Sequence, residues 1–280
     1  METYLSQRVT SIAMTIGLLP DQQVSLVTRT APEIRDTADR PGSILVLPIG
    51  SVEQHGDHLP VVTDSALATA VAAAGATRLA SDDPILIAPP IWSGYSPHHL
   101  PFGGTITAEF DTLLALLEQV ADSALENGFD AILLLNGHGG NKSLVSSAVS
   151  TIGTDHPDCE VLGLTYFDLA ESFIDDIRES ETGGMAHGGE FETSLMLHLH
   201  PGLVREDRME ATHWDEHYDL GGQDLLDGGA LSVYRSFDEY SNTGAIGAPE
   251  LASAEKGERI LERLADELAA LLEEIHAKNK

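Results

Sequence analysis

The sequence predicts an α/β protein in which helices cover both faces of a mainly parallel sheet. Short apolar runs, bounded by Gly, Pro or polar residues, alternate along the chain with longer segments of helical periodicity. This alternation is typical of parallel sheets, because a crossover between parallel strands needs a helix-length connection. Ligands of such sheets bind at the carboxyl ends of the strands, so the residues that follow each strand are the candidates for chemistry.

The apolar runs predict strands at residues 43–49, 84–88, 130–135 and 160–166. The first of them, SILVLPI, is continuously apolar and lies between two Gly residues, as expected of a buried strand. Helical spacing predicts helices at residues 64–79, 111–127, 141–153, 190–198 and 253–277. The segment 201–250 is polar, Gly-rich and poorly periodic, and we expect mostly loop there.

The length and composition are those of one globular domain. The chain has 280 residues, of which 42% are hydrophobic, and α/β chains of this size often fold as a single unit. We expect residues 24–280 to form one catalytic domain, preceded by an extension, residues 1–23, whose structure the pattern does not define. No apolar run reaches the roughly 18 residues of a membrane-spanning helix.

The charge is strongly acidic. Asp and Glu number 45 against 15 Lys and Arg, which gives a formal net charge of -30. Such a surface repels phosphate backbones and anionic lipids, which disfavours nucleic-acid and membrane partners. Dispersed carboxylates with few lysines indicate a halophilic cytoplasm, with an ordinary acidic protein as the alternative. The single cysteine is compatible with a reducing interior.

Carboxylates and imidazoles follow two of the predicted strands. Glu53, His55 and Asp64 come after the first strand, and His138 comes after the third in the turn NGHGGN. Mixed Glu, His and Asp ligands suit zinc, manganese or iron(II), and the two oxygens of Asp64 could bridge two metals. Alternatives are a helix N-cap for Asp64, a solvated loop pair for Glu53 and His55, and a phosphate-binding turn around His138.

Two further segments are candidates for the same site. His187 precedes a predicted helix and is free to reach into the site, where we expect it to be catalytic together with Glu192. Glu190 and Glu192 are two residues apart and point in different directions, and Glu190 is expected to be a first-turn acid of the helix. Tyr95 and His98 lie in a His- and Gly-rich segment that suits a substrate-covering loop.

These residues lie in segments that resemble the creatininase family. The segments are LPIGSVEQHGDHLPVVTD, PPIWSGYSPHH with GGTIT, LLLNGHGGN and HGGEFETSLML, in the family's order and with similar spacing from residue 43 to the segment EKGERILERL. The resemblance implies a three-layer α/β/α sandwich, a centre with two divalent metal ions per subunit and a homo-oligomer, often a hexamer. It also implies that Glu53, His55, Asp64 and His138 bind metal and that His187 contacts substrate.

The sequence departs from creatininase itself in a metal ligand and in the tryptophans near the substrate, which are absent at Phe167 and just before His187. Where creatininase has a tyrosine and a metal-binding glutamate after NGH, this chain has Gly139 and Gly140, so that a water or Glu192 would fill the ligand position. Phe167 stands where a tryptophan would contact the substrate. We expect Gly139, Gly140, Tyr95, His98 and Phe167 to bind the substrate, and these departures argue against creatinine itself as that substrate.

The predicted function is a metal-dependent amidohydrolase that cleaves the C–N bond of a small-molecule amide, cyclic like creatinine or related to it, by a metal-activated water. His187 would give a proton to the leaving nitrogen. The alternative within the family is a formamide hydrolase acting on a pyrimidine intermediate of archaeal riboflavin and F420 biosynthesis; the family also includes a peptide-trimming enzyme. The alternative from another class is a metal-dependent binding protein without turnover, which would have a closed ligand set.

Overall fold

A four-stranded parallel sheet forms the centre of the residues described by the computed structural model, 23–214, 218–222, 224–226 and 229–280. β1 (Ile44–Ile49) lies between β2 (Ile85–Ile87) and β3 (Ala131–Asn136), and β4 (Glu160–Thr165) pairs with β3. The parallel sheet predicted from the apolar runs is therefore confirmed. The predicted extension, residues 1–23, lies outside the described residues except for Gln23.

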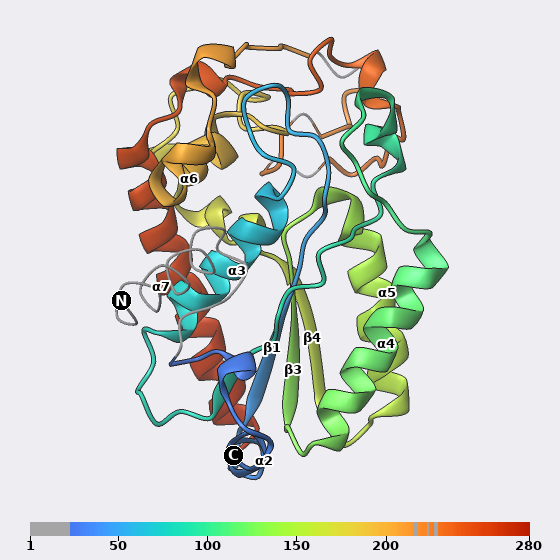
Figure 1. The fold of residues 1–280 in the computed structure, drawn as a ribbon, viewed down its shortest axis with the longest axis vertical. Helices are drawn as coiled ribbons and strands as arrows, with labels where there is room; N and C mark the ends of the chain where they lie inside the picture. The colour runs from blue at the N-terminus through green and yellow to red at the C-terminus, as the bar shows by residue number, and fades with distance from the viewer. Residues whose placement is uncertain (1–22, 215–217, 223, 227–228) are drawn as a thin grey trace, which may run out of the picture.

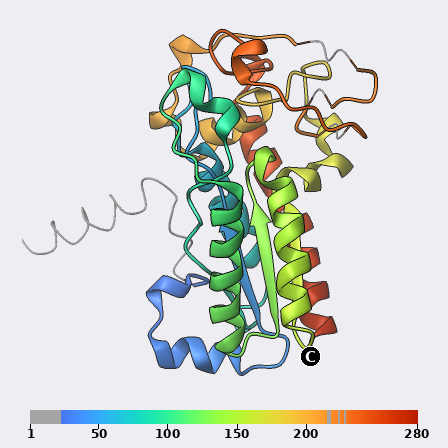
Figure 2. The ribbon, with the colours of Figure 1, turned by 90° about the vertical axis from the view of Figure 1, so that its right-hand side faces the viewer.

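Helices cover the sheet on both faces, which gives three layers (Figures 1 and 2). One layer consists of α3 (Thr63–Ala76), α6 (Glu190–Leu199) and α7 (Ala254–Lys278). The other consists of α4 (Phe110–Glu126) and α5 (Lys142–Asp155). The three-layer α/β/α sandwich is confirmed.

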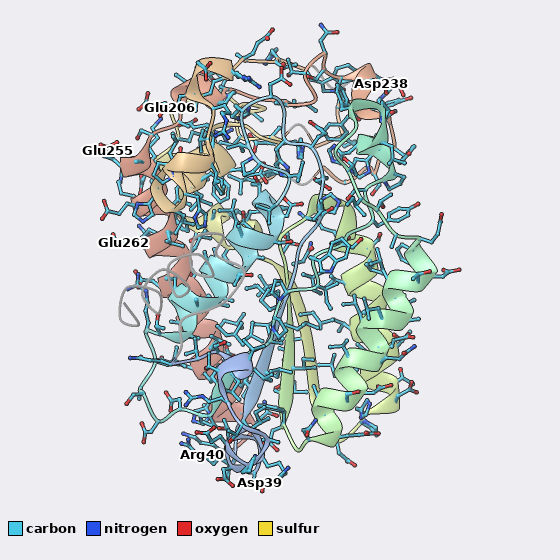
Figure 3. All side chains as sticks on the ribbon, in the orientation of Figure 1. Asp39, Arg40, Glu206, Asp238, Glu255 and Glu262 are labelled. Carbon is cyan, nitrogen blue, oxygen red and sulfur yellow. The ribbon has the colours of Figure 1, made fainter. Side chains whose placement is uncertain are left out.

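The strands β1, β2 and β3 are buried on both faces, because their successive side chains alternate between two cores, whereas the edge strand β4 is mostly half-buried. In β1, Ile44 and Val46 pack toward α3 and α7, whereas Leu45, Leu47 and Ile49 pack toward α4 and α5. This is the reason that the strands read as continuous apolar runs in the sequence. The outer surface carries the charge, as the labelled Glu206, Asp238, Glu255 and Glu262 illustrate (Figure 3).

The main difference from the sequence prediction is α2 (Ala31–Ala38). Its start carries a capping box between Thr30 and Glu33, with Pro32 in the first turn, a recognisable helix signal that the prediction did not use. The predicted loop at 201–250 is confirmed: its described residues form only short 3-10 turns such as Phe237–Glu239 and isolated bridges. No helix among the described residues is long and apolar enough to cross a membrane.

Candidate metal centre

The candidate site lies beyond the carboxyl ends of β1 and β3, where loops from three strands meet the start of α6. Asn141 joins these loops: its side-chain amide donates to the carbonyl of Gly50 (3.1 Å) and its side-chain oxygen accepts from the backbone N–H of Tyr95 (2.9 Å). Its side chain does not cap α5. The loops after β1, β2 and β3 are therefore held in one arrangement by a single buried amide.

Two groups of donor atoms share Asp64. In the first group, His138 Nδ1 lies 3.0 Å from Glu53 Oε1 and 3.3 Å from Asp64 Oδ2. In the second, His55 Nε2 lies 2.9 Å from Asp64 Oδ1 and 3.8 Å from Glu192 Oε1. All five side chains are buried, and the atoms of each group lie within 4.8 Å of one another. The structure thus brings together the four residues predicted as ligands and adds Glu192.

The atoms that face away from the centre have other partners. Ser96 donates to Glu53 Oε2 (2.5 Å), Gly188 N–H donates to Glu192 Oε2 (2.7 Å), and His55 Nδ1 donates to the carbonyl of Glu53 (3.1 Å). Among the described residues, Glu53 Oε1 and Asp64 Oδ2 are buried without a hydrogen bond. Unsatisfied buried carboxylate oxygens beside imidazole nitrogens fit a divalent cation such as zinc or manganese.

The electrostatics of the centre favour positive charge. Burial by itself would raise the pKa of Glu53, but His138 and His99 beside the carboxylate lower it well below its usual range. Burial opposes protonation of His138, yet Glu53 and Asp64 raise its pKa to about 10. In the same way, Asp64 and Glu192 overcome burial and raise the pKa of His55 well above its usual value. The buried carboxylates therefore create a negative potential that stabilises a cation at this centre.

Two more imidazoles border the centre as neutral groups, because burial lowers the pKa of both His187 and His99. His187 Nε2 donates to the backbone carbonyl of Gln54 (2.6 Å), which leaves Nδ1 as the basic nitrogen, 3.8 Å from Glu53 Oε1. The Gln54 amide donates to His99 Nδ1 (2.7 Å), so Nε2 is the protonated nitrogen of His99; it lies 3.2 Å from Glu53 Oε1 without the geometry of a hydrogen bond. The tautomer of each ring is thus set by its surroundings.

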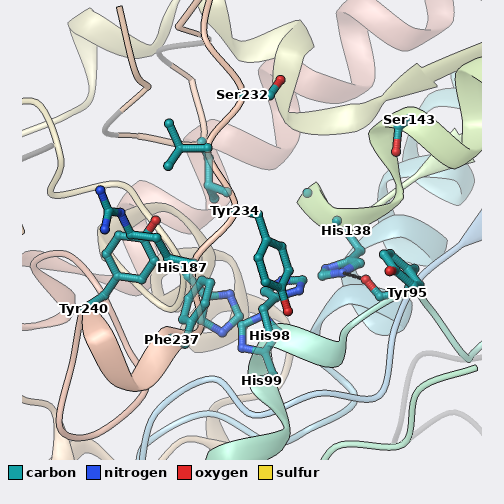
Figure 4. Close-up of a pocket in the computed structure, with 15 residues that line it drawn as sticks. Tyr95, His98, His99, His138, Ser143, His187, Ser232, Tyr234, Phe237 and Tyr240 are labelled. Carbon is teal, nitrogen blue, oxygen red and sulfur yellow. Dashed lines mark hydrogen bonds between the residues drawn. The ribbon is translucent and has the colours of Figure 1, made fainter. Parts of the chain in front are cut away.

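A pocket of about 510 Å³ opens beside the centre (Figure 4). Its lining includes the predicted residues Tyr95, His98, Gly139 and Gly140, together with His138 and His187. Phe167 is not part of this lining, because it is buried in the core beside Tyr166.

Gly140 occupies a position with no room for a side chain. A Cβ atom there would lie 2.4 Å from His138 Nε2, 2.6 Å from the carbonyl oxygen of Tyr95 and 3.0 Å from His98 Cε1. The neighbouring loop therefore fills the space in which a ligand at this position would stand. Glu192, expected as an alternative source of the missing carboxylate, reaches the centre from α6 and lies beside His55 and Asp64.

Glu190 and Glu192 point in different directions, as expected from their spacing. Glu190 accepts hydrogen bonds from the backbone of Glu179 and Ser180 and pairs with Lys256 Nζ of α7 (2.5 Å). It is thus a buried acid at the start of α6 that joins this helix to α7.

Several residues at the site were not predicted from the sequence. Ser96 and His99 lie in the segment SPHH together with His98. Neither has a sequence spacing to the other candidate residues that would have indicated its role. The opposite wall of the pocket comes from the loop segment 231–240, which has no periodicity that could place it. Its residues in the pocket include Tyr234, Arg235, Phe237 and Tyr240.

Residues 28–272 match a family model described as creatininase, creatinine amidohydrolase. A mycofactocin precursor peptide peptidase of Mycobacterium ulcerans is 35% identical over 80% of this chain and 82% of its own. A creatinine amidohydrolase of Pseudomonas putida is 29% identical over 78% of this chain and 84% of its own. A 3-dehydro-scyllo-inosose hydrolase of Thermotoga maritima is 27% identical over 89% of this chain and 82% of its own.

Solved structures similar to this chain also include creatininases. A creatininase structure described as the manganese form superimposes with a TM-score of 0.75 at 27% identity, covering 90% of this chain and 98% of the other. A zinc–zinc form of a creatininase variant gives a TM-score of 0.75 at 27% identity, with 89% and 96% covered.

Proposed function

The chain belongs to the creatininase family of amidohydrolases, and we propose that it hydrolyses a C–N amide bond with the help of two divalent cations that share Asp64. Glu53, Asp64 and His138 would hold one cation, and His55, Asp64 and Glu192 the other. The observation that carries this proposal is the convergence of buried donor atoms, two of which, Glu53 Oε1 and Asp64 Oδ2, have no hydrogen bond among the described residues. The manganese and zinc forms of similar structures support these two metals as candidates.

When bound, such cations polarise an amide carbonyl and lower the pKa of a water molecule. The basic Nδ1 of His187 borders the pocket, and its ring is fixed by the Gln54 carbonyl. It is therefore suited to take up a proton during attack and to deliver it to the leaving nitrogen. Gly139 and Gly140 begin a short 3-10 turn, whose first N–H groups have no acceptor within the turn and can stabilise an oxyanion.

We propose a substrate larger than a single small ring. A pocket of about 510 Å³ lies in the range that takes drug-sized ligands. The relatives named peptide peptidases, at 31 to 35% identity, are also more similar to this chain than the creatinine amidohydrolase is, at 29%. An acyl amino acid or short peptide amide accounts for both observations.

The test combines metal analysis with a substrate screen. The protein is stripped of metal, reconstituted with Mn²⁺ or Zn²⁺, and assayed with creatinine, formamides, acyl amino acids and short peptides. His138→Ala should lose bound metal and hydrolysis together, whereas His156→Ala, whose ring pairs with Asp122 away from the site, should keep both. Hydrolysis by metal-free His138→Ala would contradict the proposal, and metal binding by the parent without any turnover would favour the binding-protein alternative.

A further inference from the structure

The pocket beside the metal centre differs in charge from the rest of the molecule. The chain has 45 acidic and 15 basic residues, yet the described lining of this pocket includes Arg235 and no Asp or Glu. A second pocket, lined by Glu210, Asp238 and Glu239, has the acidic character expected of the whole surface. Because a net charge of -30 repels anions at long range, a pocket lining that includes an arginine and no carboxylate is the more favourable place for an anionic group.

The guanidinium of Arg235 has capacity for a ligand. Its side chain is 21% exposed, and its Nε is buried without a hydrogen bond among the described residues. Its contact with Glu239 is long, 3.8 Å from Nη1 to Oε2, and the other oxygen of Glu239 accepts from the backbone of Ser236. The centroid of the Trp214 ring lies 5.8 Å from its central carbon, within cation–π range.

Aromatic side chains connect Arg235 with the metal centre. Phe237 lies 4.1 Å from the ring of His99 and 5.1 Å from that of His187, and 5.5 Å from Tyr240, as measured between ring centroids. Figure 4 shows Tyr234, Phe237 and Tyr240 ranged along the pocket from the side of His138 outward. A ligand that reaches from the centre to Arg235 would therefore lie along an apolar wall.

We propose that the substrate carries a carboxylate that binds Arg235 while its scissile amide lies between His138 and His187. This inference rests on the proposed function and narrows the substrate to acyl amino acids and peptides cleaved close to a free carboxyl terminus. The planar guanidinium fork matches a carboxylate, and a charge-assisted hydrogen bond of this kind changes affinity by about 10- to 100-fold.

The experiment compares two probes on the metal-loaded protein: hippurate, which has a carboxylate, and hippuramide, its uncharged amide. Calorimetry should show hippurate bound at least about tenfold more tightly. Arg235→Gln should abolish this preference, because it weakens the binding of hippurate more than that of hippuramide. Arg235→Lys, which keeps the charge, should retain a preference, and Arg78→Gln, on an exposed arginine paired with Asp266, should retain all of it.

Equal affinity of the two probes for the parent protein, or a preference that survives in Arg235→Gln, would overturn the proposal. Metal content and hydrolysis of uncharged amides, measured on the same samples, report on the proposed function separately. A protein that binds metal and hydrolyses uncharged amides but does not prefer hippurate would retain the proposed function and lose only the role of Arg235.

Discussion

Ser96 orients both a carboxylate and an imidazole of the first donor group. Its hydroxyl lies 2.5 Å from Glu53 Oε2, 3.1 Å from His138 Nε2 and 2.7 Å from Ser51 Oγ, and all four side chains are buried. The single proton of Ser96 goes to the carboxylate, so its lone pairs accept from the other two groups. With Nε2 as a donor, His138 presents Nδ1 to the centre.

Ser96→Ala should therefore weaken metal binding by about 10- to 100-fold, the usual effect of removing a group that orients a ligand. Competition with a fluorescent chelator measures the affinity, and urea unfolding of the metal-free protein shows whether the fold is intact. Ser93→Ala, on a half-buried serine three residues earlier whose hydroxyl donates to the carbonyl of Ile106, is the control. Equal metal affinity of Ser96→Ala and Ser93→Ala would contradict the orienting role.

For single residues, the sequence was enough to find candidate ligands at the ends of strands, but not the residues that contact those ligands. Glu53, His55, Asp64 and His138 were found because carboxylates and imidazoles follow buried strands. Ser96, His99 and Arg235 were not, because their importance depends on contacts between loops that no local pattern encodes. The prediction that Glu192 is catalytic remains a prediction, and the geometry at His55 supports a ligand role for it.

The contact between α6 and α7 sets the position of the second donor group, because Glu192 lies in the first turn of α6. At Gly257, a Cβ atom would lie 2.0 Å from the carbonyl oxygen of Ser194, so the two helix backbones touch. The buried pair of Glu190 and Lys256 fixes the same contact and uses one of the four lysines of the chain. The close backbone contact and the buried ion pair together fix the separation between α6 and α7.

Gly257→Ala should lower the free energy of unfolding by about 2–3 kcal/mol, because the added methyl group forces the helices apart. Gly153→Ala is the matched control. Its Cβ would meet only Val161, at 3.9 Å, so it should stabilise α5 by about 0.5–1 kcal/mol through helix propensity. Urea unfolding measures both changes, and a Gly257→Ala protein as stable as the parent would refute the close contact.

Secondary structure was predictable wherever burial imposes a regular pattern of apolar residues on the sequence. The strands and the helices from α3 to α7 show apolar runs or apolar faces, and their predicted bounds lie within a few residues of those observed. The helix α2 has one buried residue and was missed, since its signal lies in its cap. The pocket wall in segment 231–240 follows from tertiary contacts and could not be predicted.

For the whole molecule, charge is the property with the clearest consequence. A net charge of -30 over 280 residues means that folding brings carboxylates together, and this repulsion opposes the compact state. At molar salt concentration the Debye length is about 3 Å, so the repulsion between exposed charges farther apart than this is largely screened. The halophilic origin and the oligomer expected from the sequence stay predictions.

Raising NaCl from 0.1 to 2 M should therefore raise the melting temperature by at least a few degrees, since about 1 kcal/mol corresponds to roughly 2–4 °C for a domain of this size. Scanning fluorimetry measures the shift, and an equal concentration of sucrose controls for excluded-solute effects. A melting temperature that stays constant or falls with NaCl would show that surface repulsion is unimportant.

The most direct test of the account is the metal content of Asp64→Asn, because Asp64 is the residue that both donor groups share. The substitution keeps the shape of the side chain and removes its negative charge. Plasma mass spectrometry on protein reconstituted with Mn²⁺ or Zn²⁺ should give close to two ions per chain for the parent and close to none for Asp64→Asn. A variant that keeps the parent's metal content would contradict a centre built around Asp64.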